Sequence, residues 1–154
     1  NAGTLHDKLM IEGLLLTLRT LNAIGDNQFE TTQQKAVSNL KTAHKLNKVN
    51  CKIDWSKSGC QIINHVRGLN PYPSAWTLLQ NGNDLINLKL YEVQFEKITH
   101  QLEIGKVVID KSSIKVATRD GFIDLTSFKF PGKKQMDVKS FLNGFSFDTE
   151  AKMV

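Results

Sequence analysis

The sequence changes from a helix-like to a strand-like pattern within the stretch Arg67-Gly68-Leu69-Asn70-Pro71-Tyr72-Pro73-Ser74-Ala75-Trp76-Thr77. A helix-like segment runs into its first residues, and the two prolines that follow forbid any helix. Each proline biases the residue before it, Asn70 or Tyr72, towards an extended conformation. The sequence therefore predicts that the chain leaves a helix and enters a strand within about one turn. Tyr72 and Trp76 are expected to cover this corner by packing in the core, with stacking on a base as the alternative.

Helices are predicted on both sides of a polar segment. The first spans about Thr4 to Ile24, with Thr4 and Asp7 as a capping-box-like pair. Its apolar residues cover far more than one stripe, which is typical of a helix buried against other elements. No sheet precedes it, so we expect it to pack on the domain that follows or on a second copy of the chain. A second helix, about Ser58 to Arg67, is predicted from apolar residues at helical spacing.

Short strand-like segments follow the corner at residues 76–79, 86–95, 105–110, 114–118 and 122–130. The alternation of apolar residues changes phase between Leu90 and Tyr91, which indicates a bulge or a sharp bend. Five short strands with tight turns favour a small barrel, for which the oligonucleotide-binding (OB) type is the usual nucleic-acid example. Asp137 is expected to cap a closing helix, and residues 146–154 to be frayed. The expected fold class is thus α+β: an N-terminal helix and linker, then a small OB-like β-barrel domain with flanking helices.

Positive charge is concentrated in one segment, residues 35–57, which we call the lysine segment. It holds one acid, Asp54, and six lysines: Lys35, Lys41, Lys45, Lys48, Lys52 and Lys57. It therefore carries a charge equal to the whole net charge of +5. A solvated linker fits this composition, and so does a strap against a phosphate backbone, where each neutralised phosphate releases counterions.

Several classes of protein are disfavoured by what the chain contains. It has no apolar run of membrane-spanning length, and its first residues do not form a signal peptide. Cys51 and Cys60 lack histidines at ligand spacing, so we expect reduced thiols in a cytoplasmic protein and no metal site. Neither a Ser-His-Asp arrangement nor a phosphate-binding loop is present, and we expect no catalytic residue here.

The corner and its flanks resemble the C-terminal region of methionyl-tRNA formyltransferases. The resemblance is carried by Arg67-Gly68-Leu69-Asn70-Pro71-Tyr72-Pro73-Ser74-Ala75-Trp76, by Lys52-Ile53-Asp54-Trp55-Ser56 upstream, and by Gly132-Lys133-Lys134-Gln135-Met136 with Phe141-Leu142-Asn143-Gly144 downstream. The N-terminal Ala2-Gly3-Thr4-Leu5-His6-Asp7-Lys8-Leu9 is similar to the start of the last helix of that family's catalytic domain. The implied organisation is a terminal helix of a truncated Rossmann-like catalytic domain at 1–27, a basic linker at 28–51 and a C-terminal OB-like domain at 52–154.

The resemblance implies a function for the longer protein from which we suspect the chain was cut. That enzyme moves a formyl group from 10-formyltetrahydrofolate to the amino group of initiator methionyl-tRNA, with its catalytic Asn, His and Asp upstream of this chain. The adjacent pair Asn64 and His65 does not match that motif, and His65 is expected to be a partly exposed helix residue. The chain itself would need no cofactor and would act by holding the tRNA.

Five residues are predicted to contact tRNA. Lys45 and Lys48 fall where the family places basic residues, although residues 30–40 depart from its usual pattern. Lys133 and Lys134 form a loop pair before a helix N-terminus, where phosphate is favoured, or else a solvated basic turn. Arg67 could reach RNA or bind a carbonyl at the corner.

Two other functions remain open at this point. One is the matching domain of a formyltransferase that acts on a nucleotide-linked amino sugar or is coupled to folate oxidation. The other is a free-standing OB-type nucleic-acid-binding module. The basic linker and the segment Gly132-Lys133-Lys134-Gln135-Met136 favour tRNA over the substrates of these other formyltransferases. The apolar helix at about Thr4 to Ile24, which has no sheet before it to pack on, argues against a free-standing module. We expect neither DNA nor membrane as a partner, and a non-physiological dimer through the N-terminal helix is possible.

Overall fold

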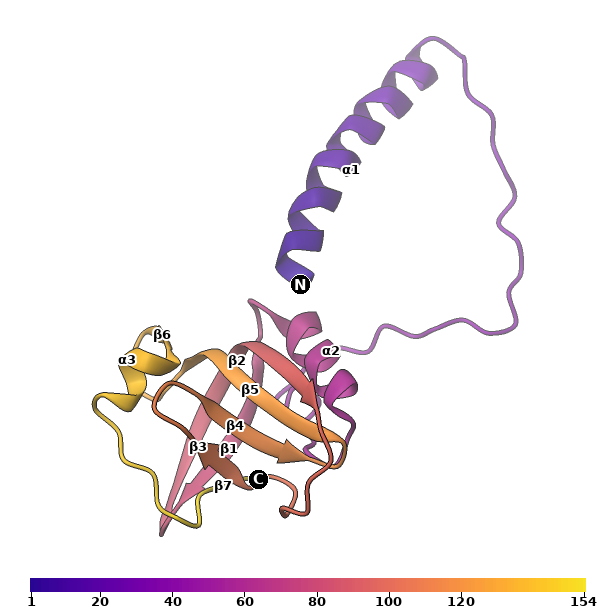
Figure 1. Cartoon of the computed structure of the whole chain (residues 1–154). Coiled ribbons are helices and arrows are strands. Elements are labelled where there is room, and N and C mark those ends of the chain that lie inside the picture. Colours follow the sequence, from indigo (N-terminus) through magenta and orange to yellow (C-terminus); the bar gives the residue numbers. More distant parts are fainter. The chain divides into compact units, whose positions relative to one another are not determined.

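A computed structural model describes all residues, 1–154. It divides the chain into two compact units. One consists of Gly3–Lys45, and the other of Leu46–Val154 together with Asn1–Ala2. The second unit, called the barrel domain below, contains every strand and two of the three helices (Figure 1).

The helix of the first unit is α1, Ala2–Gly25. It begins two residues before Thr4, so Thr4 and Asp7 lie within the helix and the predicted capping pair is wrong. None of its residues is buried, and its apolar side chains, among them Leu9, Leu14 and Leu16, are exposed. Packing of this helix on the barrel domain or on a second copy of the chain, and a dimer through it, stay predictions. No helix of the chain is both long and apolar enough to cross a membrane.

The predicted corner is present. Helix α2, Gly59–Leu69, buries Ile62, Val66 and Leu69, which lie at helical spacing on one face. It ends at Asn70, which is extended with φ −86° and ψ 131°, and both X-Pro peptide bonds of the corner are cis. Strand β1, Ala75–Asn81, starts six residues after the helix ends. The two prolines thus stand where the sequence requires the change from helix to strand.

Ser58 caps helix α2 through a complete capping box with Gln61. We expect Ser58→Ala to lower the free energy of unfolding of the barrel domain by about 1 kcal/mol, because a main-chain N–H loses its acceptor. Urea denaturation measures this loss. Cys60→Ala, a change of an exposed residue on the same helix, serves as the control and should leave the stability within about 0.5 kcal/mol.

Seven strands form one antiparallel sheet in the order β3-β4-β5-β2-β1-β7, with β6 beside β5. Besides β1, they are β2 (Asp84–Lys97), β3 (Val107–Ile109), β4 (Ile114–Thr118), β5 (Gly121–Lys129), β6 (Gln135–Asp137) and β7 (Lys152–Met153). The pairing of β2 with β5 shifts register between Leu90 and Val93, which confirms the bulge predicted there. The sheet bends into a nearly closed, OB-like barrel (Figure 1).

The core lies inside this barrel and continues under a short helix. Alternate residues of β1, β2 and β5 are fully buried, as the period of a strand requires; they include Leu79, Leu88, Leu90, Ile123 and Leu125. Phe128, beyond the register shift of β5 with β2, is fully buried as well. Helix α3, Val138–Leu142, is capped by Asp137, whose carboxylate accepts a hydrogen bond from the Ser140 N–H at 2.9 Å. Its Phe141 meets Phe128 edge to face, with 5.0 Å between ring centroids.

The C-terminal residues close the barrel, and the prediction that residues 146–154 are frayed is wrong. The Val107 N–H donates to the Ala151 carbonyl at 3.0 Å, and the Met153 N–H donates to the Gly105 carbonyl at 2.8 Å. Ala151 and Met153 are buried.

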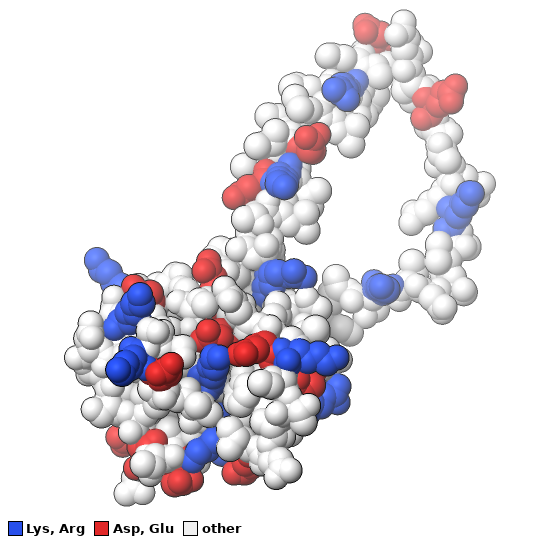
Figure 2. Space-filling view, in the orientation of Figure 1, with Lys and Arg blue, Asp and Glu red and all other residues white.

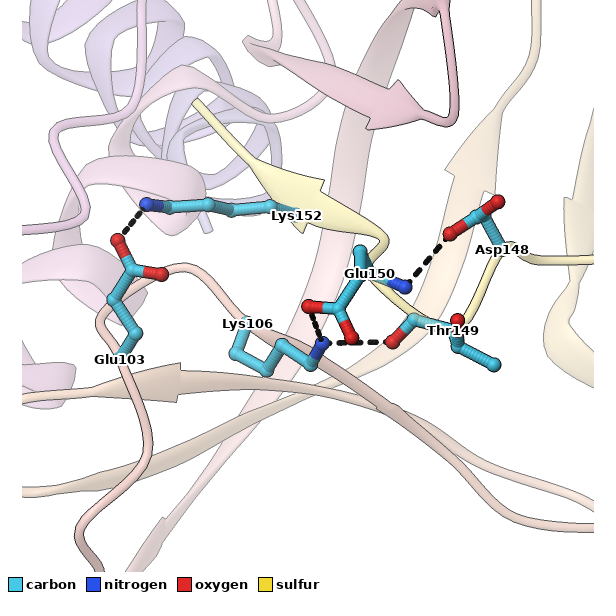
Figure 3. A network of polar contacts seen from close by, with 6 residues as sticks. All are labelled: Glu103, Lys106, Asp148, Thr149, Glu150 and Lys152. Carbon is cyan, nitrogen blue, oxygen red and sulfur yellow. Dashed lines mark hydrogen bonds and ion pairs between the residues drawn. The ribbon is translucent and has the colours of Figure 1, made fainter.

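Polar side chains hold this closure from outside (Figure 3). The Lys106 ammonium donates to the Thr149 carbonyl at 2.7 Å and to the Glu150 carboxylate at 2.8 Å, while Lys152 pairs with Glu103. The C-terminal end is therefore fixed to the loop before β3 by charge pairs as well as by main-chain bonds.

Candidate nucleic-acid interface

Residues 47–51 of the lysine segment, which belong to the barrel domain, form an ordered turn. The Asn47 side-chain oxygen accepts from the Val49 N–H at 2.9 Å and from the Asn50 N–H at 3.1 Å. The Asn50 side chain accepts from the Asn47 N–H at 2.7 Å, and the Cys51 N–H donates to the Asn47 carbonyl at 3.1 Å. Because side chains take the place of regular secondary structure here, Lys48 is presented from a fixed main chain.

Trp76 of β1 fastens this turn to the barrel. Its indole N–H donates to the Lys48 carbonyl at 2.7 Å. Its main chain exchanges hydrogen bonds with the neighbouring segment, accepting from the Ile53 N–H at 2.8 Å and donating to the Cys51 carbonyl at 3.1 Å. The ammonium groups of Lys48 and Lys52 lie 5.4 Å and 5.7 Å from the centre of the indole ring, within cation–π range. Two positive charges are therefore held beside one aromatic ring.

Removing the indole donor should loosen the turn. In Trp76→Phe the Lys48 carbonyl loses its partner, which we expect to lower the free energy of unfolding by about 1 kcal/mol. Hydrogen exchange at the amides of residues 47–51 measures the local effect and should become faster. Exchange at the amides of β4 is the internal control and should change only by the small global loss; uniform acceleration across the domain would contradict the anchoring role.

Tyr72 is 85% exposed, so the expectation that it packs in the core is wrong. It lies between the two prolines in the turn formed by residues 71–73, and its side chain is exposed to solvent there. Trp76, in contrast, is half-buried and packs against the core, as expected. Tyr72 is therefore free to meet a partner outside the domain.

A pocket of about 390 Å³ opens beside these two rings. Its lining includes Tyr72, Pro73, Trp76, Lys48, Asn87 and Lys89. It falls within the roughly 300–1,000 Å³ of small-molecule sites. The combination of aromatic faces and ammonium groups suits a nucleotide, whose base stacks and whose phosphate pairs with lysine. Sequence reasoning missed Lys89, although its outward position in an alternating strand was a usable signal.

The one acid of the lysine segment, Asp54, forms no ion pair with Lys48 or Lys52. The Asp54 carboxylate accepts from the Ser56 hydroxyl at 2.6 Å and from the Ser56 N–H at 3.0 Å. These bonds, the hydroxyl's first, hold the pKa of Asp54 below its ordinary value, and the nearby Lys57 charge acts in the same direction. Asp54 is thus ionised at neutral pH and is engaged with Ser56.

The other predicted contacts are placed as follows. Lys45 ends the first unit, three residues before Lys48. Arg67 is exposed on α2, where its guanidinium donates to the Asn64 side chain at 2.8 Å. Its predicted bond to a carbonyl at the corner is not seen.

Lys133 and Lys134 are exposed in the turn between β5 and β6. Strand β6 separates them from α3, and the first turn of that helix is already capped by Asp137. The expectation that they precede a helix N-terminus open to phosphate is therefore wrong. Lys133 instead lies over the Phe130 ring, with its ammonium 6.0 Å from the ring centre.

His65 is partly exposed, as expected, and Cys51 and Cys60 are free thiols. No cluster of three or more His, Cys, Asp or Glu side chains is placed to hold a metal ion. On the face of the barrel domain seen in Figure 2, acidic and basic side chains alternate. Charge of a single sign therefore does not cover this face.

Comparison with known proteins assigns the domain. Residues 45–146 match the family described as "Formyl transferase, C-terminal domain". The chain belongs to this family. It is similar to the methionyl-tRNA formyltransferases of Flavobacterium johnsoniae (47% identity over 99% of this chain and 49% of that protein) and Bacteroides thetaiotaomicron (37% over 99% and 49%). The chain thus spans about half the length of these relatives.

A solved structure shares the fold of this formyltransferase domain. It is that of a HypX variant from Aquifex aeolicus, with a TM-score of 0.56 and 17% identity, covering 86% of this chain and 24% of that one. At this identity the likeness concerns the fold alone.

Proposed function

We propose that the chain is the C-terminal, tRNA-binding part of a methionyl-tRNA formyltransferase. The complete enzyme would transfer a formyl group from 10-formyltetrahydrofolate to the amino group of initiator methionyl-tRNA, in the cytoplasm, at the start of translation. The family assignment and the names of relatives that extend well beyond this chain support the proposal. The catalytic Asn, His and Asp are proposed to lie outside residues 1–154.

In this proposal the chain contributes binding energy and orientation. Holding a large substrate so that its reacting end meets a distant active site lowers the barrier by fixing geometry in advance. The observation that carries the proposal is the lysine turn fixed on Trp76, which presents Lys48 and Lys52 outward from the barrel.

Substituting two lysines of this segment tests the function. We expect Lys45→Ala with Lys48→Ala to weaken binding of initiator methionyl-tRNA and to make the slope of log K against log salt shallower by about 1.8, for two lost phosphate contacts. Fluorescence polarisation of labelled tRNA across a salt series measures both quantities.

The matched control removes the same charge elsewhere. Lys97→Ala with Lys111→Ala changes two exposed lysines at the end of β2 and after β3. If the control pair weakens tRNA binding as much as the Lys45 and Lys48 pair does, the loss reflects the net charge of the chain and not contacts at Lys45 and Lys48. Unchanged binding in the Lys45 and Lys48 variant would point to a formyltransferase for a nucleotide-linked sugar or one coupled to folate oxidation.

A further inference from the structure

The register of the strands places a line of residues across the outside of the barrel. Trp76 of β1 stands opposite Lys89 of β2, Lys89 stands opposite Lys129 of β5, and Lys129 stands opposite Gln135 of β6. Directly paired residues project from the same side of a sheet. Their neighbours along the strands, Ala75, Thr77, Leu88, Leu90 and Phe128, are buried, so the line itself faces outward. We call Trp76, Lys89, Lys129 and Gln135 the outer row.

Two like charges stand side by side in this row. Lys89 and Lys129 are both exposed and directly paired, an arrangement that destabilises a sheet. Neither forms an ion pair, whereas Lys106, Lys115 and Lys152 on the same barrel each pair with a glutamate. Asp137 lies on the same side of β6 as Gln135, but its carboxylate is occupied by the N–H and hydroxyl of Ser140. Lys89 and Lys129 therefore have no ion-pair partner within the chain, and an anion from outside would provide one.

The aromatic pocket lies at one end of the outer row. Trp76 and Lys89 belong to both, and the exposed Tyr72 forms another wall of the pocket. The side-chain amide of Asn87, also in the lining, can donate and accept hydrogen bonds at the edge of a base. From Trp76 to Gln135 the row crosses three strand spacings, about 14 Å. Its length suits a short stretch of a strand with one base in the pocket and phosphates over the lysines.

We propose that the outer row and its pocket bind an RNA strand, with phosphates on Lys89 and Lys129 and one unstacked base between Tyr72 and Trp76. The proposal rests on the proposed tRNA-binding function and extends its surface to Lys89, Lys129 and Tyr72, with Lys48 at the edge of the same pocket. An aromatic pocket favours nucleic acid over an acidic peptide, because a base offers a face to stack on and a carboxylate does not.

Two ligands and two variants test it, using the full chain. The ligands are initiator methionyl-tRNA and an unstructured octauridylate. Lys89→Ala with Lys129→Ala should make the salt slope for the octauridylate shallower by about 1.4, the single-strand value for two contacts. Tyr72→Ala should weaken octauridylate binding about fivefold or more, and Tyr72→Phe should restore it, since stacking needs the ring alone. Lys97→Ala with Lys111→Ala is again the matched control.

Tryptophan emission adds a direct readout. Trp55 is buried, so quenching of the emission by RNA reports Trp76. Quenching by octauridylate that is lost in Tyr72→Ala supports the pocket, and an oligonucleotide backbone without bases should not quench. An acidic peptide that binds as well as octauridylate would overturn the proposal.

The outcomes separate this proposal from the proposed function. If Lys45 and Lys48 govern tRNA binding while the outer-row variants leave both RNAs bound as before, the outer-row proposal fails and the function stands. If octauridylate binds through the outer row and initiator tRNA does not bind, the proposed function fails alone. If neither RNA binds, both fail.

Discussion

Phe128→Ala is expected to lower the free energy of unfolding of the barrel domain by about 3–5 kcal/mol. Phe128 is fully buried and meets Phe141 of α3 edge to face, so its removal leaves a cavity where barrel and helix join. Urea denaturation followed by circular dichroism measures the loss. Phe29→Ala, at a residue that is 54% exposed in the first unit, is the control and should change stability by less than about 0.5 kcal/mol. A loss below about 1 kcal/mol for Phe128→Ala would mean that α3 and the barrel do not share a core.

Met153→Ala is expected to cost about 2–5 kcal/mol although it lies next to the last residue. Met153 is fully buried on β7, and its main chain bonds to Gly105. The neighbouring Val154→Ala is the matched control, because Val154 is 36% exposed and keeps its main-chain bonds to Leu78. Thermal unfolding of both variants compares them. Equal, small losses at the two positions would show that the C-terminal residues are frayed after all.

Features with a local physical cause were predictable from the sequence. The prolines at 71 and 73 end α2, Ser58 with Gln61 begins it, and the change of phase near Leu90 marks the bulge of β2. Each depends on residues within a few positions of one another, so a short stretch contains the whole signal. The OB-like barrel followed from these segments taken together.

Features created by distant pairing were not predictable. Strand β7 has two residues, too few for an alternating pattern. It forms because Met153 pairs with Leu79 of β1 and donates its N–H to the Gly105 carbonyl. Lys89 and Lys129 are forty positions apart and become neighbours only through the register of β2 with β5. No local rule brings them together.

The candidate site shows the same division. The lysine segment was visible as a run of charge, but the sequence alone does not show which of its residues are fixed. The structure fixes Lys48 by a bond from Trp76, a residue 28 positions away. It also exposes Tyr72, whose place at the proline corner suggested core packing. The domain boundaries at residues 27 and 51 and the five tRNA contacts stay predictions.

The salt dependence of tRNA binding by the unmodified chain tests the central claim most directly. If Lys45, Lys48 and Lys52 each meet a phosphate, a plot of log K against log salt for initiator methionyl-tRNA should be linear with a slope of about −2.7 or steeper. A slope near zero, or no binding at low salt, would contradict the claim that this domain holds tRNA by its phosphates.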